Sequence, residues 1–224
     1  MSDEISTHLA KQVDEYIEHL LIPQDAALEQ GLKDAEAAGL PPISVSANEG
    51  KLLYLIAKIA NAKRVLEIGT LGGYSTTWLA RALPYDGMLI TLELDQKHAE
   101  VARKNLDRAG VGDRVEIRIG TAIYSLQQML DQHEESFDMI FIDANKDSYV
   151  EYLNLSLQLA HTGTVILADN LIRNGRALEE NPPDENARGA KAYNQAMAAN
   201  PRLDSIILPI IRTNLDGISI SIVK

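Results

Sequence analysis

The sequence predicts an α/β protein in which a mainly parallel sheet carries helices on both faces. Two observations indicate this class: short apolar runs alternate with amphipathic segments from residue 64 onward, and polar residues follow the apolar runs. Strands that alternate with helices form parallel sheets through crossover connections. The 224 residues fit a single domain, 1–224, with a helical cap at 1–62 and an α/β core at 63–224.

The composition is that of a globular protein, with 46% hydrophobic and 24% charged residues. The chain has no cysteine, which excludes disulfides and thiolate metal sites. Its formal net charge of −11 argues against a broad nucleic-acid-binding face, although a local basic patch is compatible with it. The N-terminal region is rich in charged residues and has no signal-peptide core, and no apolar run is long enough to cross a membrane. We therefore expect a cytoplasmic protein.

Residues 4–38 are expected to be helical. Leu9 and Val13 belong to a series of apolar residues at helical spacing, and Pro23 interrupts that series. A second helix is predicted from Asp25 to Ala38. The favoured interpretation is a helical cap on the sheet, and the alternative is a lid or a dimer surface beside the functional site.

A capping box marks the start of the next helix. Ser46 is followed three residues later by Glu49, the spacing at which the two side chains cap each other's backbone. The predicted helix runs from Glu49 to Ala60, and its apolar residues, such as Leu53, recur on one face.

The stretch RVLEIGTLGGYS, residues 64–75, is the one around which the other elements are arranged. A short apolar strand, Arg64–Ile68, is followed by Gly69, Gly72 and Gly73, and a helix begins at Tyr74. A strand, a glycine turn and a helix open the sheet of many nucleotide-binding α/β proteins. The glycine spacing matches neither the dinucleotide-binding fingerprint nor the P-loop.

An acidic residue, Glu67, precedes the first glycine by two positions. A carboxylate there would repel a phosphate and would suit a cationic ligand. S-adenosylmethionine carries a sulfonium and an ammonium group, so it is the candidate ligand. The alternative is a plain glycine turn in a domain that binds no phosphate.

The second strand is predicted at Leu89–Leu94 and contains Glu93, with Asp95 just beyond it. An acidic residue about 20 positions beyond such a glycine turn commonly binds the ribose hydroxyls of a nucleotide. Glu93 is the candidate for that role, and the alternative is a solvated charge at a strand end. A helix is predicted from Lys97 to Ala109, ended by Gly110.

The later elements follow from the same alternation of patterns. They are strands at 115–119, 137–142, 164–168, 205–208 and 218–223, and helices at 123–132, 149–159 and 190–200. The strand at 137–142 is mostly apolar and is expected to be central. The turn signal at Asp216-Gly217 suggests that the last two strands form an antiparallel edge. The segment 171–189 has no periodicity and is expected to be a lid loop over the strand ends.

Polar residues gather at the predicted carboxyl ends of the strands, where ligands of such sheets bind. They are Glu67, Glu93, Asp143, Asn145, Lys146, Asp169 and Asn170. If the fourth and fifth strands are neighbours, Asp143, Asp169 and Asn170 lie side by side. Two carboxylates and an amide oxygen suit Mg²⁺, and after it Ca²⁺ or Mn²⁺. The alternative is that these residues are N-caps of the helices that follow.

Lys146 is the candidate general base. A nearby cation and burial both lower the pKa of a lysine, and a neutral amine can take a proton from a phenol. The alternative is a surface lysine. The histidines are scattered and form no ligand pair: His8, His19, His98, His133 and His161.

Five motifs together resemble the cation-dependent class I O-methyltransferases, the family of caffeoyl-CoA and catechol O-methyltransferases and their bacterial relatives. They are SANEG (46–50), VLEIGTLGGYS (65–75), FDMIFIDANK (137–146), GTVILADN (163–170) and DGISISIVK (216–224). Their order and spacing are specific, and they cover the chain from about Ser46 to its last residue.

The resemblance implies a Rossmann-like seven-stranded sheet with an antiparallel last strand, and methyl transfer from S-adenosylmethionine to a catechol-like phenol. It implies a divalent metal at Asp143, Asp169 and Asn170, with Lys146 and Asp143 as catalytic residues and Asn174 as a substrate contact. The residues implied for the cofactor are Val45, Glu67, Gly69, Ser75, Glu93, Ala122, Asp143 and Asn145. The expected partners are a small phenolic substrate and a second copy of the chain in a homodimer.

One position departs from the family pattern. Many relatives read Asp-Ala-Asp-Lys where this chain has Asn145 in the third place. The amide removes a negative charge that would face the sulfonium, so we expect weaker affinity for S-adenosylmethionine and retained activity.

Two other functions are compatible with the sequence. Some bacterial relatives methylate a hydroxylated uridine in transfer RNA, and a basic rim for phosphates would consist of Arg173, Arg176, Arg188 and Lys191. Interleaved acidic residues favour a solvated loop in its place. The second alternative is a module that binds S-adenosylmethionine without catalysis, against which the complete set of polar residues argues.

Overall fold

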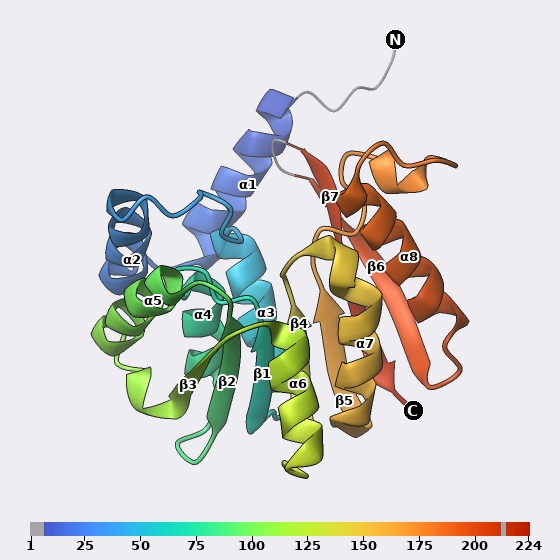
Figure 1. The fold of residues 1–224 in the computed structure, drawn as a ribbon. Coiled ribbons are helices and arrows are strands. Elements are labelled where there is room, and N and C mark those ends of the chain that lie inside the picture. The colour runs from blue at the N-terminus through green and yellow to red at the C-terminus, as the bar shows by residue number, and fades with distance from the viewer. Residues whose placement is uncertain (1–6, 212–213) are drawn as a thin grey trace.

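The structure is a computed structural model that describes residues 7–211 and 214–224. Within these residues, seven strands form one sheet (Figure 1). The strand order is β3-β2-β1-β4-β5-β7-β6. Strands β1 to β5 are parallel to one another, whereas β7 is antiparallel to both β5 and β6. The strands are β1 (Arg64–Ile68), β2 (Met88–Glu93), β3 (Val115–Ile119), β4 (Phe137–Ile142), β5 (Ala160–Ala168), β6 (Leu203–Ile211) and β7 (Leu215–Val223).

Helices cover both faces of this sheet. Side chains alternate between the faces along each strand, so Met139 and Phe141 of β4 join one apolar core and Ile140 and Ile142 join the other. The first core packs against α3 (Ala47–Ile59), α4 (Tyr74–Ala82) and α5 (Gln96–Arg108). The second packs against α6 (Ala122–Asp131), α7 (Tyr149–Gln158) and α8 (Glu185–Ala199). The expected α/β class, with its central fourth strand and antiparallel last strand, is confirmed.

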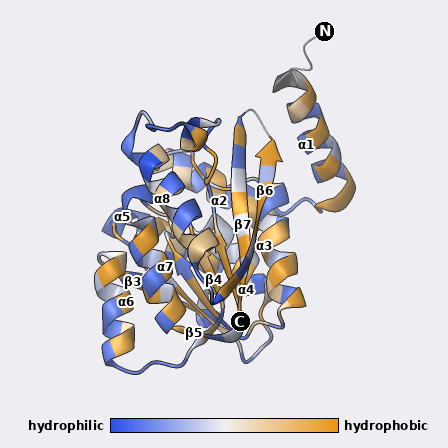
Figure 2. Cartoon of the chain, turned by 90° about the vertical axis from the view of Figure 1, so that its right-hand side faces the viewer, coloured by the Kyte–Doolittle hydropathy of each residue, from blue (hydrophilic) through white to orange (hydrophobic). Residues whose placement is uncertain are grey.

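Two further helices, α1 (Thr7–Leu21) and α2 (Ala26–Ala37), precede α3. Asp25 caps α2, because its carboxylate accepts hydrogen bonds from the backbone of Ala27 and Leu28. Helix α1 projects from the body of the molecule and carries exposed apolar side chains, among them Tyr16 and Leu20 (Figure 2). Residues 4–6 of the predicted first helix lie outside the described residues, and the homodimer and the division at residue 62 stay predictions.

The last third of the chain differs most from the expectation. Helix α8 begins at Glu185 rather than at residue 190, because Asp184 caps it by accepting from the Ala187 backbone. The lid loop is therefore shorter than predicted. Asp216-Gly217 is not a turn but lies inside β7, where Gly217 pairs with Pro209. A Cβ on Gly217 would lie 2.7 Å from the Ile172 side chain, so this glycine serves close packing.

Other differences are small. Strand β5 begins at Ala160 rather than at residue 164, and β6 and β7 both extend beyond their predicted ends, since their pairing continues to Ile211 and Leu215. The 3₁₀ turns η1 (Gly112–Arg114), η2 (Lys146–Ser148) and η3 (Arg176–Leu178) were not predicted. No helix in the described part of the chain is long and apolar enough to span a membrane.

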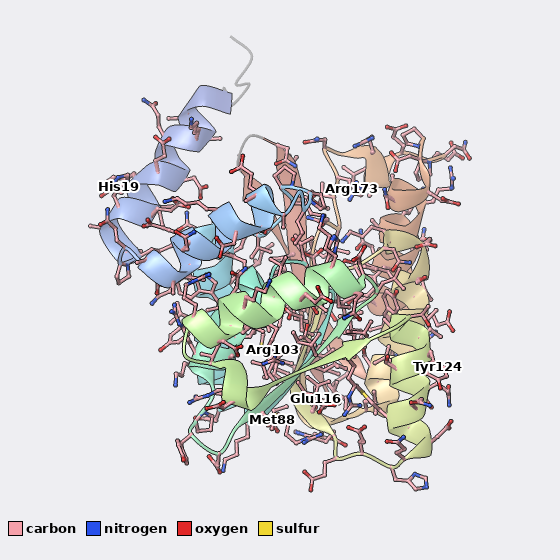
Figure 3. All side chains as sticks on the ribbon, turned by 60° about the vertical axis from the view of Figure 1, so that its left-hand side comes forward. His19, Met88, Arg103, Glu116, Tyr124 and Arg173 are labelled. Carbon is pink, nitrogen blue, oxygen red and sulfur yellow. The ribbon has the colours of Figure 1, made fainter. Side chains whose placement is uncertain are left out.

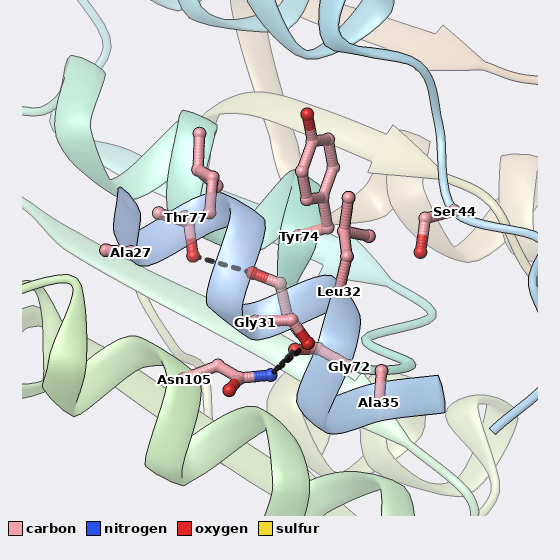
Figure 4. A pocket seen from close by; sticks show the side chains of 11 residues that line it. Ala27, Gly31, Leu32, Ala35, Ser44, Gly72, Tyr74, Thr77 and Asn105 are labelled. Carbon is pink, nitrogen blue, oxygen red and sulfur yellow. Dashed lines mark hydrogen bonds between the residues drawn. The ribbon is translucent and has the colours of Figure 1, made fainter. Parts of the chain in front are cut away.

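Asn105 on α5 holds α2 against the glycine turn. Its buried amide nitrogen donates to the carbonyl oxygens of Gly72, at 2.9 Å, and Gly31, at 3.2 Å (Figure 4). The cavity between these elements measures only about 10 Å³, which is too small for any ligand larger than water. Three segments distant in the sequence therefore depend on one side chain.

We expect Asn105→Ala to lower the free energy of unfolding by about 1–3 kcal/mol, because it leaves two backbone acceptors without their donor. Urea unfolding at neutral pH measures the change. Gln127→Ala, which removes an exposed amide contact to Asp131, is the control and is expected to change the free energy by less than about 0.5 kcal/mol. Equal values for the two variants would contradict the role given to Asn105.

Candidate active site

Two aspartates follow neighbouring strands of the sheet. Ile142 at the end of β4 pairs with Ala168 at the end of β5, so Asp143 and Asp169 leave the sheet side by side. The backbone N–H of Asp169 donates to the Ile142 carbonyl at 3.1 Å, which continues the pairing by one residue. The expected juxtaposition of these two residues is therefore present at the carboxyl edge of the sheet.

The glycine turn touches the same edge. Gly69 has a φ of 105°, which favours glycine, and a Cβ there would lie 2.1 Å from the carbonyl oxygen of Asp143. The Asp143 N–H in turn donates to the Ile68 carbonyl at 2.9 Å. The turn after β1 and the loop after β4 are thus in direct contact, with no space for a side chain between them.

Lys146 points into this edge rather than into solvent. The residue is only 5% exposed. Its Nζ donates to Asp143 Oδ1 at 3.0 Å and to the Tyr149 hydroxyl at 2.5 Å. The surface-lysine alternative does not describe this side chain.

Tyr149 links Lys146 to the two strand ends. Its hydroxyl lies 3.2 Å from the carbonyl oxygens of both Ile142 and Asp169, which share its single proton. Burial, and then the charges of Asp143 and Asp169, raise the pKa of Tyr149 well above its ordinary value. The sequence predicted only a packing role for this residue, and the structure adds a polar one.

Asp169 and Asn170 form a bonded pair beside Asp143. Asp169 is 3% exposed and accepts from the Asn170 backbone at 2.7 Å and from the Asn170 amide at 3.1 Å. Burial, together with the charge of Asp143, raises the pKa of Asp169 well above its ordinary value. Among the described residues, the helical segments that follow these two loops are η2, α7 and η3, and their N-cap residues are Asn145, Ser148 and Gly175. The capping alternative is therefore not realised.

A metal ion at this edge would be held by the carboxylates of Asp143 and Asp169 and by the amide oxygen of Asn170. Among the described residues, no group of three or more His, Cys, Asp or Glu side chains is arranged to hold a metal ion. Two adjacent carboxylates and an amide oxygen at a buried edge are the hard donors that Mg²⁺ and Ca²⁺ take. The residues present therefore fit a divalent cation, and the metal stays a prediction.

Glu67 is fully buried at the end of β1 and joins three elements. Its carboxylate accepts from the hydroxyls of Ser75 at 2.6 Å, Thr76 at 2.5 Å and Thr91 at 2.7 Å. Burial outweighs these hydrogen bonds and raises the pKa of Glu67 to about 7. In this structure the acid fastens α4 and β2 to β1, and the cofactor roles expected of Glu67 and Ser75 stay predictions.

Glu93 turns back onto the glycine turn. Its carboxylate accepts from the backbone N–H groups of Leu71 at 2.8 Å, Thr70 at 3.3 Å and Asp95 at 2.9 Å. Glu93 lies beside the turn, and its expected contact to a ribose stays a prediction. The sequence analysis did not identify Thr70 as part of this region. Its hydroxyl lies 2.6 Å from that of Thr91.

The other expected cofactor residues lie around the same edge. Val45 is buried just before α3 and lines, with Tyr74 and Trp78, a groove of about 370 Å³ next to α1 and α2. Ala122 is the first residue of α6 and follows β3. Their cofactor roles stay predictions.

Asn145 is bonded within its own turn. Its amide nitrogen donates to Asp147 at 2.5 Å and to the Ser148 hydroxyl at 2.9 Å, and its oxygen accepts from the Tyr152 hydroxyl at 2.6 Å. The resemblance to the family predicted that Asn145 contacts the cofactor. The structure gives it a second role, because the amide organises the start of α7.

The loop after β5 is fixed to β7. Buried Asp216 accepts from the backbone of Ile172 and Arg173, each at 3.0 Å. Asn174 Oδ1 accepts from the Leu215 N–H at 2.9 Å, and the Asn174 N–H donates to the Leu215 carbonyl at 2.7 Å. The sequence predicted a turn at Asp216 and did not predict this contact of its carboxylate. The substrate contact expected at Asn174 stays a prediction.

Arg173 and Asn174 both have left-handed backbone, with φ values of 52° and 56°. Non-glycine residues rarely adopt this conformation, and it is concentrated at ligand-binding sites. Figure 3 places Arg173 at the end of the molecule opposite Met88, the first residue of β2. The loop therefore lies at the same end as the strand termini described above.

The expected basic rim is largely engaged by its own loop. Arg176 pairs with Asp184 at 2.8 Å, and Lys191 donates to the carbonyl oxygens of Glu179 and Glu180 at 2.6 and 2.9 Å. These cations serve the loop itself, which favours the solvated-loop interpretation over a surface for phosphates.

The fold and the polar edge are those of a methyltransferase, and comparison with known proteins gives the family. The family model for O-methyltransferase matches residues 22–222. The chain therefore belongs to the O-methyltransferase family, as the five motifs indicated, and the expected enzyme class is confirmed.

Individual relatives are similar over nearly their whole length. The chain is 47% identical to a catechol O-methyltransferase of Niastella koreensis over 98% of this chain and 100% of the relative. It is 44% identical to a catechol O-methyltransferase of Mycobacterium tuberculosis over 95% of each. The crystal structure of an O-methyltransferase from Bacillus cereus in complex with SAH matches with a TM-score of 0.95 at 42% identity, over 97% of this chain and 100% of that one.

The raised pKa of Glu67 predicts a pH-dependent stability. Because the folded pKa of about 7 lies above the ordinary 4.5, only the folded state keeps the proton between these values. Stability should therefore fall as pH rises through this window, by a total on the order of 3 kcal/mol. Glu67→Gln removes this titration.

The measurement is urea unfolding from pH 4.5 to 7.5. We expect the free energy of unfolding of the Glu67→Gln variant, relative to wild type, to rise across the window. Glu135→Gln, at a side chain that is 84% exposed, is the control and should follow wild type at every pH. A Glu67→Gln curve parallel to wild type would show that the buried acid does not titrate there.

Proposed function

We propose that this enzyme transfers a methyl group from S-adenosylmethionine to one hydroxyl of a catechol-like phenol, with the help of a divalent cation. The observation that carries the proposal is the placement of Lys146, buried between Asp143 and Tyr149 and beside the Asp169–Asn170 pair. The names of the two bacterial relatives support a vicinal-diol substrate, and the SAH complex of the Bacillus cereus enzyme supports the cofactor.

Asp143, Asp169 and Asn170 would hold the cation. A cation bound there would bind adjacent substrate oxygens and make the reacting hydroxyl more acidic. The bound S-adenosylmethionine would supply an electrophilic methyl group on its sulfonium. The cofactor would lie along the glycine turn, and Glu93 would accept hydrogen bonds from its ribose hydroxyls.

Lys146 Nζ would accept the proton of the reacting hydroxyl. The phenolate left by this proton transfer would be the nucleophile for the methyl group that bound S-adenosylmethionine would supply. Asp143 orients Lys146 through their 3.0 Å contact. Positioning of the two reactants and exclusion of water from the oxygen supply much of the rate.

Removal of divalent cations should abolish the reaction. With caffeate as acceptor, we expect EDTA to stop methylation and excess Mg²⁺ to restore it, as followed by chromatography of the methylated product. Coumarate with a single hydroxyl is the matched control and should not be methylated under either condition. Undiminished turnover of caffeate in EDTA would refute the metal at Asp143 and Asp169.

Lys146→Ala should leave the affinity for S-adenosylmethionine within about threefold and lower kcat by about 10²- to 10⁴-fold, the contribution of a general base. Titration calorimetry and steady-state rates with caffeate measure the two quantities. Lys63→Ala, at an exposed lysine before β1, is the control and should keep wild-type kcat. Wild-type kcat in Lys146→Ala would eliminate Lys146 as the base.

A further inference from the structure

Helix α8 packs against the turn that carries Lys146, and one glycine makes this packing possible. A Cβ at Gly189 would lie 2.0 Å from the carbonyl oxygen of Lys146 and 3.0 Å from the backbone nitrogen of Asp147. Both are backbone atoms, which cannot move aside as a flexible side chain can. Any larger residue at position 189 would therefore displace the Lys146 backbone from α8.

The same face of α8 also supports the Lys146 side chain. Tyr193 lies four residues after Gly189, which places both on one side of the helix. Its ring packs edge-on against the Tyr149 ring, with 5.5 Å between centroids, and both tyrosines are fully buried. Tyr149 in turn receives the hydrogen bond from Lys146 Nζ. Helix α8 thus contacts the lysine at its backbone and, through Tyr149, at its ammonium group.

A third contact reaches the loop after β5. The Asn194 amide on α8 donates to the Leu171 carbonyl at 3.0 Å, one residue beyond Asn170. The helix itself begins where the lid loop ends, because Asp184 both caps it and pairs with Arg176 of η3. One rigid element therefore connects the lid loop with the two loops that carry the polar edge.

From this arrangement we infer that Gly189 and Tyr149 are positioning residues for Lys146, through which α8 sets the reactive placement of its amine. The inference rests on the proposed function, since it assigns Lys146 as the base. It predicts that a side chain at position 189 lowers the rate of methyl transfer and spares cofactor binding. Most of the residues implied for the cofactor lie on β1 and β2, at the glycine turn, before α3 and at the start of α6, whereas α8 contacts α7, β6 and the turns η2 and η3. Asp143 and Asn145 are the exceptions, because they precede the turn that α8 contacts.

The experiment compares Gly189→Ala with Gly31→Ala. Gly31 is also helical, but a Cβ there meets its nearest neighbour, in the Asn105 side chain, at 3.4 Å, which is an ordinary contact. With caffeate and radiolabelled S-adenosylmethionine, we expect kcat of Gly189→Ala to fall about ten- to a hundredfold. The affinity for S-adenosylmethionine should stay within about twofold of wild type, and Gly31→Ala should keep wild-type kcat.

A double-mutant cycle separates positioning from general damage. In a Lys146→Ala background the group to be positioned is gone, so Gly189→Ala should have no further effect on the residual rate. Tyr149→Phe removes only the hydroxyl that binds Lys146. It should likewise lower kcat by itself and have no further effect in the Lys146→Ala background. It replaces Gly189→Ala if the Gly189→Ala variant does not fold.

Two results would overturn the inference: wild-type kcat in Gly189→Ala, or a loss that recurs in full when Lys146 is already alanine. For Tyr149→Phe the same two results apply. If the wild-type enzyme methylates no vicinal diol, the proposed function itself is refuted. Assaying the wild type first distinguishes this outcome from a failure of the inference about Gly189 and Tyr149.

Discussion

The close approach of Gly69 to the Asp143 carbonyl is the contact on which the active-site edge depends. Because β1 and β4 are adjacent, the turn after one strand and the loop after the other meet where both leave the sheet. The glycine turn and the acidic pair are thereby placed within one small region. The proposed meeting of a methyl donor and an activated oxygen follows from this single adjacency.

Much of the architecture was predictable, because period-2 and period-3.6 patterns report burial directly. Strands β1, β3 and β4 have the predicted bounds, and the juxtaposition of Asp143 and Asp169 follows from the adjacency of β4 and β5. In a parallel sheet the residue after each strand lies at a known edge, so chemistry can be assigned before any coordinates exist.

The residues that the sequence did not reveal act through tertiary contacts. The Asp216-Gly217 pair is typical of a turn. The Asp216 carboxylate is nevertheless buried against the backbone of a loop more than forty residues earlier in the chain. The sequence places Gly189 in the loop 171–189 because that segment has no periodicity, and only the approach of the Lys146 backbone explains why a glycine is needed there. The spacing of Tyr149 is that of an ordinary packing residue, and its hydroxyl partners are the last residue of β4 and the residue that follows β5.

The continuity of the lid loop with α8 has a consequence for how substrate range can change. Insertions before Asp184 alter the loop and leave the rotational phase of the helix unchanged. One residue inserted between Glu185 and Gly189 would instead rotate that face by about 100° and turn a side chain toward Lys146. Loop length can vary with the acceptor, whereas the first turn of α8 has a fixed length.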